Sequence, residues 1–293
     1  MYKKILMKFI VFKFFFLIFI NSSYLIAKDF PSIPADIDIL NKTYCDKSGR
    51  KFGHVVILLD TTSKLEKAQI DFIRDQVFSN EFYLSREPFT KFSYLLINDK
   101  GTQEQEYIFS KCRPKTGVGP SKLEMNSWTE NEKLLMKFFD DFKKDALKTQ
   151  EQVFKSNTTS NYSLIYETIA YLFQNPKRDF SEKAGKRELI IVSDMMQHSD
   201  RISFYKTCNA VSNLAKCPSF QTFMQNLSVG DKDYLVVTAP KGQGVNLKLI
   251  YLNNVYEKNR EIDRSLISLW ENYFNDRGFG KIEIIRQLDI PKT

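Results

Sequence analysis

Two aspartates in this chain stand where chemistry is expected, each at the end of an apolar run and before a polar loop. Asp60 follows the run His54–Leu59, and the hydroxyl residues Thr61–Ser63 come directly after it. Asp194 closes a second run, Glu188–Ser193, far downstream. Short apolar runs of this kind are typical of strands buried on both faces, and ligands of open α/β sheets bind at the carboxyl ends of such strands. The sequence therefore predicts one site that contains both carboxylates.

A third polar segment lies between the two aspartates. Residues Ser156–Ser163 are rich in hydroxyl side chains and precede an apolar helical pattern, Leu164–Phe173. Ser, Thr and Asn are common helix caps, so the segment has an ordinary structural explanation. It can also deliver the Ser163 hydroxyl to a shared site. One or two carboxylates combined with hydroxyl oxygens suit Mg²⁺, with Mn²⁺ or Ca²⁺ as alternatives.

This set of residues resembles the metal-ion-dependent adhesion site (MIDAS) of von Willebrand factor type A (vWA) domains. That site takes Asp-x-Ser/Thr-x-Ser after the first strand, a Thr or Ser from a later loop, and an Asp after the fourth strand. Asp60 and Thr62 match the first element, Ser163 stands at the middle hydroxyl, and Asp194 matches the last element. The resemblance implies a doubly wound α/β fold. It also implies a protein-binding role, in which a carboxylate of the partner completes the coordination of the cation.

The chain departs from the family pattern at Lys64, which stands where a serine ligand is expected. An ammonium group close to a divalent cation is repelled and cannot act as a ligand. One hypothesis is that Lys64 points to solvent while Ser63 supplies an oxygen. The other is a degenerate, metal-free site in which Lys64 pairs with Asp60 or Asp194. A further candidate side chain for the site is His198, in the polar loop that follows.

A phosphatase of the haloacid-dehalogenase type is an alternative of another class. In it, Asp60 would be the phosphorylated nucleophile and a late aspartate would bind Mg²⁺. That family has a second Asp two positions after the nucleophile, where this chain has Thr62, and paired acids late in the chain, where only Asp194 ends its strand. No Gly-x-Ser-x-Gly motif accompanies the two histidines. The sequence favours a binding module over an enzyme.

Strands and helices alternate along the remainder of the chain. Strands are predicted at 54–60, 90–98, 106–110, 188–194, 233–238, 245–252 and 281–287, and helices at 65–78, 130–153, 164–173, 220–227 and 260–275. The first helix is expected to begin with a capping box formed by Ser63 and Glu66. Alternation of this kind predicts an α/β fold, a doubly wound and mostly parallel central sheet with helices on both faces. We expect an irregular lead-in over 28–52 and one vWA-like domain over 53–290.

The N-terminus has the composition of a targeting segment. Four lysines, the apolar run Phe14–Ile20, and Ala27 before a charged start predict a secretory signal peptide over 1–27. An uncleaved N-terminal membrane anchor is the alternative. The expected location is therefore the periplasm or the exterior, or the outer side of the inner membrane for an anchored chain. A membrane contact is expected only through this segment.

Four cysteines remain beyond that segment: Cys45, Cys112, Cys208 and Cys217. An even number in an exported chain favours disulfides, and three pairings are possible. A Cys208–Cys217 bond would close a short polar loop at low entropic cost, which leaves Cys45 with Cys112. No cysteine or histidine spacing is typical of a zinc site.

The charge of the chain argues against nucleic acid as a partner. The formal net charge is +8 over 293 residues. Residues 1–27 contribute four lysines and no acidic residue, which is half of that excess. The modest remainder is spread along the chain and does not form a basic stripe. We expect a protein partner.

Overall fold

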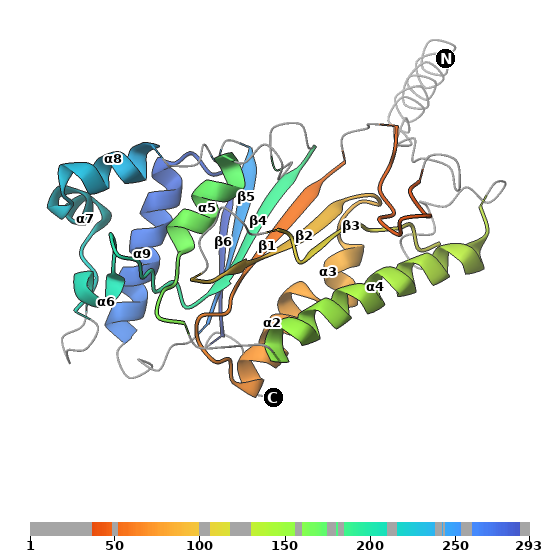
Figure 1. Cartoon of the computed structure of the whole chain (residues 1–293), viewed down its shortest axis with the longest axis horizontal. Coiled ribbons are helices and arrows are strands. Elements are labelled where there is room, and N and C mark those ends of the chain that lie inside the picture. Colours follow the sequence, from red (N-terminus) through yellow and green to blue (C-terminus); the bar gives the residue numbers. More distant parts are fainter. Residues whose placement is uncertain are drawn as a thin grey trace, which may run out of the picture. The chain divides into compact units, whose positions relative to one another are not determined.

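Strand β1 lies inside a six-stranded sheet, and all seven of its residues are buried. The computed structural model describes residues 37–48, 52–99, 106–117, 130–155, 160–174, 180, 185–209, 216–237, 242, 244–252 and 260–287. The strands are β1 (His54–Asp60), β2 (Lys91–Ile97), β3 (Phe109–Cys112), β4 (Arg187–Ser193), β5 (Val245–Tyr251) and β6 (Ile282–Arg286). Their order is β3-β2-β1-β4-β5-β6 (Figure 1).

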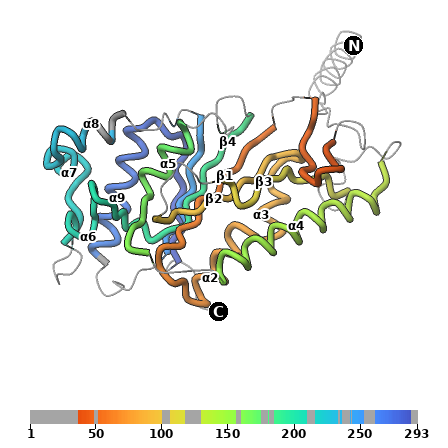
Figure 2. Tube along the Cα trace, in the orientation of Figure 1, coloured from red at the N-terminus to blue at the C-terminus, as the bar shows by residue number. Residues whose placement is uncertain are grey.

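Every neighbouring pair in this sheet is parallel except β2 and β3, which are antiparallel. Figure 2 shows β1 beside β4, although more than a hundred residues separate them in sequence. Parallel strands need crossover connections, and their burial on both faces explains the continuous apolar runs. The carboxyl ends of β1, β2, β4 and β5 consequently meet at one edge of the sheet, which is the edge where Asp60 lies.

Helices cover the sheet from both sides (Figure 1). They are α2 (Lys67–Val77), α3 (Asn80–Leu84), α4 (Glu132–Lys155), α5 (Ile165–Gln174), α6 (Phe204–Thr207), α7 (Phe220–Asn226), α8 (Val229–Val237) and α9 (Arg260–Asp276). On one face, Val56 and Leu58 of β1 belong to a core cluster with Ile169 of α5 and Trp270 of α9. The apolar residues of α5 and α9 are the surfaces that enter this core.

The opposite face is packed mainly by aromatic rings. Phe92 of β2 contacts Phe82 and Tyr83 of α3 and Phe142 of α4, with ring centroids 5.2 to 6.0 Å apart. The hydroxyl of Tyr83 is hydrogen-bonded to that of Tyr94 at 2.7 Å, so both buried polar groups are satisfied. The alternation of side chains along β2 thus separates aromatic residues on this face from aliphatic ones on the other.

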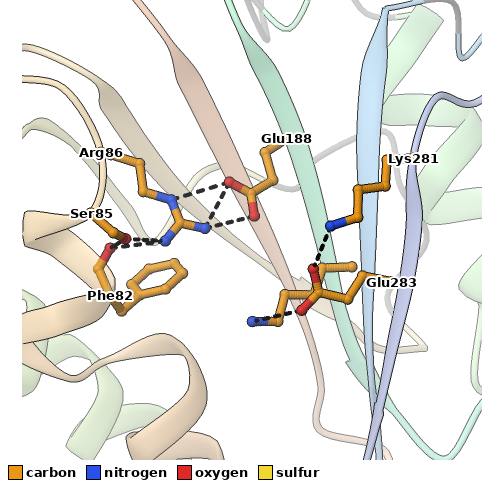
Figure 3. A network of polar contacts seen from close by, with 7 residues as sticks. Phe82, Ser85, Arg86, Glu188, Lys281 and Glu283 are labelled. Carbon is orange, nitrogen blue, oxygen red and sulfur yellow. Dashed lines mark hydrogen bonds and ion pairs between the residues drawn. The ribbon is translucent and has the colours of Figure 1, made fainter.

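A polar network ties α3 to the sheet. Figure 3 shows the guanidinium of Arg86, just after α3, directed at the carboxylate of Glu188 on β4. The closest nitrogen and oxygen are 2.7 Å apart, and both side chains are about one fifth exposed (21% and 23%). Arg86 also lies over the ring of Phe82, 4.3 Å from its centroid. Lys281 and Glu283 form a more exposed pair at the start of β6 (Figure 3).

The predicted fold class is confirmed: the structure has a mostly parallel central sheet with helices on both faces. The strand predicted at 233–238 is wrong, because these residues lie largely in α8. The Ser228 hydroxyl accepts from the Asp231 backbone N–H at 3.1 Å and donates to the Asp231 carboxylate at 2.6 Å. This capping starts a helix that takes in the apolar run, and a short apolar run does not by itself distinguish helix from strand.

Two local details also differ from the predictions. Strand β3 begins at Phe109 instead of residue 106, and α2 begins after Glu66 instead of Ser63. The Glu66 backbone N–H donates to the Gln69 side chain at 2.9 Å, whereas Ser63 is exposed. The capping box therefore exists three residues later than predicted.

Both disulfides join the cysteines as the loop-closure argument favoured. Cys45 is bonded to Cys112, across 67 residues, and Cys208 is bonded to Cys217, across nine. The first bond attaches the lead-in to edge strand β3, where the Cys112 backbone N–H also donates to the Thr43 carbonyl. The predicted signal segment 1–27 lies outside the described residues. None of the described helices combines the length and apolar character needed to cross a bilayer.

Candidate functional site

The carboxylate of Asp60 is the centre of the candidate site. It lies at the end of β1, is only 7% exposed, and accepts hydrogen bonds on both oxygens. Oδ1 accepts from the Thr62 backbone N–H at 3.1 Å and from the Thr62 hydroxyl at 2.6 Å. Oδ2 accepts from the Ser163 hydroxyl at 3.1 Å and from the Ser193 hydroxyl at 2.6 Å. Two loops and the end of β4 therefore converge on one carboxylate.

Backbone hydrogen bonds hold these loops together. The Thr62 carbonyl accepts from the Ser160 N–H at 2.9 Å, which joins the loop after β1 to the loop before α5. Ser163 and His198 exchange two backbone hydrogen bonds, both of 2.9 Å, which joins the loop before α5 to the loop after β4. The site is thus fixed by main-chain contacts as well as by side chains.

The side chain of Gln197 caps the start of α5. Its oxygen accepts from the Tyr166 backbone N–H at 3.0 Å, and its nitrogen donates to Glu167 at 3.0 Å. Gln197 is fully buried. It therefore supplies a partner for one of the helix N–H groups that no residue of the helix can satisfy, and it fixes the loop that carries Ser163.

Asp194 follows β4 and lies beside Asp60. Its Oδ1 accepts from the Met196 backbone N–H at 2.9 Å. Burial, and secondly the negative charge of Asp60, raise the pKa of the Asp194 carboxyl to about 7. A neighbouring negative charge disfavours the charged form of a buried carboxyl group. The site would therefore be stabilised by a positive charge.

Comparison with solved structures finds proximal thread matrix protein 1 from the mussel byssus, in a structure with a zinc-occupied MIDAS motif. It is 14% identical with a TM-score of 0.36, over 83% of this chain and 44% of that one. A von Willebrand factor type A structure from Catenulispora acidiphila is 7% identical with a TM-score of 0.32, over 78% and 42% of the two chains. Both likenesses are distant and concern the fold alone.

The aligned part of this chain covers less than half of either of those chains. No family model matches its sequence, and no curated protein matches it.

The remaining predicted site residues are Ser63, Lys64 and His198. Ser63 and Lys64 are exposed. The hypothesis that Lys64 neutralises the site by pairing with Asp60 or Asp194 stays a prediction. His198 contributes its backbone, and its ring lies between those of Tyr162 and Tyr205 at 5.6 and 5.5 Å.

Ser193 is the site residue that the sequence analysis missed. The register of β1 and β4 pairs Leu59 with Val192, so the next residues, Asp60 and Ser193, lie side by side. Side chains alternate along strands, and neighbouring strands in register present the same face. The predicted strands 54–60 and 188–194, aligned by length, would pair Asp60 with Asp194 instead. The observed register between β1 and β4 is what identifies Ser193.

Proposed function

We propose that this chain is an exported vWA-like protein-binding module, whose site at the strand carboxyl ends uses a divalent cation to engage a carboxylate of a partner protein. The observation that carries the proposal is the convergence of the Thr62 and Ser163 hydroxyls on the Asp60 carboxylate from two separate loops. Asp194 adds a second carboxylate next to them. The two disulfides are consistent with the oxidising compartment that export implies.

The donor set fits a hard cation. Among the described residues, Cys, His, Asp and Glu side chains do not form a metal-binding group of three, so a cation here would depend on the hydroxyls. Thr62 and Ser163 direct their protons at Asp60, which leaves oxygen lone pairs for an ion. Asp60, Thr62, Ser163 and Asp194 would hold Mg²⁺, or Mn²⁺ or Ca²⁺, with water completing the coordination. The bound ion would supply positive charge for a partner's carboxylate.

The surroundings of the site explain why a cation would be required. A pocket of about 290 Å³ next to it is lined by Asp99, Glu167 and Asp200, together with Tyr162 and Arg201. The Tyr162 hydroxyl donates to Asp200 at 2.7 Å. An acidic partner group approaching the metal-free protein would meet several carboxylates and be repelled. A bound cation would replace this repulsion by attraction for the acidic group.

The hydrogen bonds of Asp60 favour binding over covalent catalysis. Both carboxylate oxygens already accept from hydroxyl or amide groups, which lowers their nucleophilicity. The phosphatase alternative has a direct test, hydrolysis of a generic aryl phosphate by the parent protein and by Asp60→Asn. Activity that depends on Asp60 would support the enzyme and contradict our proposal.

Isothermal titration with Mg²⁺ and Mn²⁺ tests the metal site. We expect binding heat from the parent protein, none from Asp60→Ala, and weakened binding from Ser163→Ala. Asp71→Ala is a matched control, because Asp71 is an exposed aspartate in an ion pair with Lys67 on α2. The absence of heat from a folded parent protein, or equal loss in Asp71→Ala, would eliminate the metal claim.

A further inference from the structure

We propose that Ser193 is the positioning residue of this site, and that its hydroxyl fixes the Asp60 carboxylate in the orientation in which Thr62 and Ser163 meet it. The consequence for ligand binding rests on the proposed function. The positioning itself is a property of the metal-free protein and can be measured there.

The contacts of Ser193 determine the direction in which its hydroxyl group donates a hydrogen bond. Its oxygen accepts from the Met195 backbone N–H at 2.8 Å, and it lies 2.6 Å from Oδ2 of Asp60. A backbone N–H can only donate, and a serine hydroxyl has a single proton. The proton of Ser193 must therefore be donated to Asp60. Short hydrogen bonds from a hydroxyl to a carboxylate are among the stronger ones in proteins.

Burial separates the role of Ser193 from the roles of the other two hydroxyl residues. Ser193 has no exposed surface, whereas Ser163 and Thr62 are 5% and 8% exposed. A ligand that arrives at the carboxyl ends of the strands can reach Thr62 and Ser163, but Ser193 lies beneath them within β4. Ser193 thus acts on the ligand only through Asp60.

The other contact of Ser193 is anchored in the core. Met195 is fully buried and has a left-handed backbone with φ of 60°, which is unusual for a residue other than glycine. Its carbonyl accepts from the indole N–H of Trp270 on α9 at 2.9 Å. Such a conformation persists where surrounding contacts determine it. The chain of contacts Trp270–Met195–Ser193–Asp60 gives the carboxylate a rigid support.

Amide hydrogen exchange in metal-free protein tests the positioning role. The informative amide is that of Thr62, because it donates to Asp60 Oδ1, whereas the Ser193 hydroxyl donates to Oδ2. In Ser193→Ala, Asp60 loses its short hydrogen bond, and we expect the Thr62 amide to exchange about tenfold faster. Ser193→Thr keeps a hydroxyl and should restore protection. The control is Ser199→Ala, because the Ser199 hydroxyl is buried in the loop after β4 and, among the described residues, its hydrogen bonds are with Ile202.

Unchanged Thr62 protection in folded Ser193→Ala would overturn the proposal, as would an equal effect of Ser199→Ala. If the added methyl group of Ser193→Thr prevents folding, the comparison of the two alanine variants decides.

Titration with Mn²⁺ then extends the test: we expect about tenfold weaker binding in Ser193→Ala than in Ser199→Ala. A parent protein that binds no Mn²⁺ would contradict the proposed function, while the exchange result would still decide the role of Ser193.

Discussion

The Asp60 carboxylate accepts hydrogen bonds on both of its oxygens. The Asp194 carboxylate accepts a hydrogen bond from the Met196 backbone and lies in the electric field of Asp60. The two carboxyl groups therefore lie in different environments. Burial, and secondly the charge of Asp60, oppose the ionisation of the Asp194 carboxyl and raise its pKa. At neutral pH the metal-free site therefore holds Asp194 only partly ionised.

The raised pKa of Asp194 makes the stability of the metal-free protein depend on pH. The pKa of Asp194 is near 3.8 in the unfolded chain and is raised to about 7 in the folded protein, by burial first and by Asp60 second. Between these values the folded state binds a proton that the unfolded state lacks, so the free energy of unfolding falls as pH rises. Urea unfolding in chelator should show lower stability at about pH 8 than at about pH 5. Asp194→Asn should remove most of this difference, and an unchanged pH dependence in that variant would contradict the assignment.

Gln150, a residue outside the site, also has an unusual environment. Gln150 of α4 is completely buried, and neither atom of its side-chain amide has a hydrogen-bond partner in the described structure. Burying an amide without partners costs about 1–3 kcal/mol. Gln150→Leu should therefore raise the free energy of unfolding by about that amount. Gln152→Leu, at an exposed position of the same helix, should change it by less than about 0.5 kcal/mol. Destabilisation by the first substitution would mean that the amide has a partner.

Among the elements, the contact of α3 with β4 depends on one bidentate ion pair, that of Arg86 with Glu188. Arg86→Leu keeps an apolar side chain over Phe82 but leaves a largely buried carboxylate without its partner. We expect a loss of about 1–2 kcal/mol in urea unfolding, and partial recovery in the double variant with Glu188→Leu. Lys281→Leu should have little effect, because that side chain is 75% exposed. Equal losses of stability in Arg86→Leu and Lys281→Leu would show that the burial of the Arg86 pair does not matter.

The elements also show what the sequence can and cannot predict. Continuous apolar runs predicted β1 and β4 to within one residue, because strands buried on both faces leave a plain signal. Strand β5 was predicted equally well, although Asn246 and Lys248 interrupt its apolar residues. The failure at α8 arose where a local cap at Ser228 outweighed strand propensity in a short run. Asp60, Thr62 and Ser163 could be predicted to meet because they lie in loops at the same sheet edge. Ser193 required the register between β1 and β4, which single-sequence patterns do not contain.

For the whole molecule, the two disulfides constrain the chain on very different length scales. The Cys45–Cys112 bond spans 67 residues and fastens the lead-in to the sheet, while the Cys208–Cys217 bond spans nine residues within the connection from α6 to α7. In the chain-entropy account, the stabilisation by a disulfide grows with the logarithm of the loop that it closes. Their contributions to global stability should therefore differ, although Cys112, Cys208 and Cys217 are all buried.

We predict that replacing both Cys45 and Cys112 by alanine lowers the free energy of unfolding by about 4 kcal/mol, against about 2–3 kcal/mol for the Cys208 and Cys217 pair. Urea denaturation of the two double variants, without reductant, measures the difference. Thiol counting on denatured parent protein should find no free thiol, since all four cysteines are bonded. Free thiols in the purified protein would contradict the pairing and would also remove the support that the cysteines give to export. A larger loss from the short loop would instead show that native packing around Cys208 outweighs chain entropy, because that side chain lies in the same core cluster as Trp270.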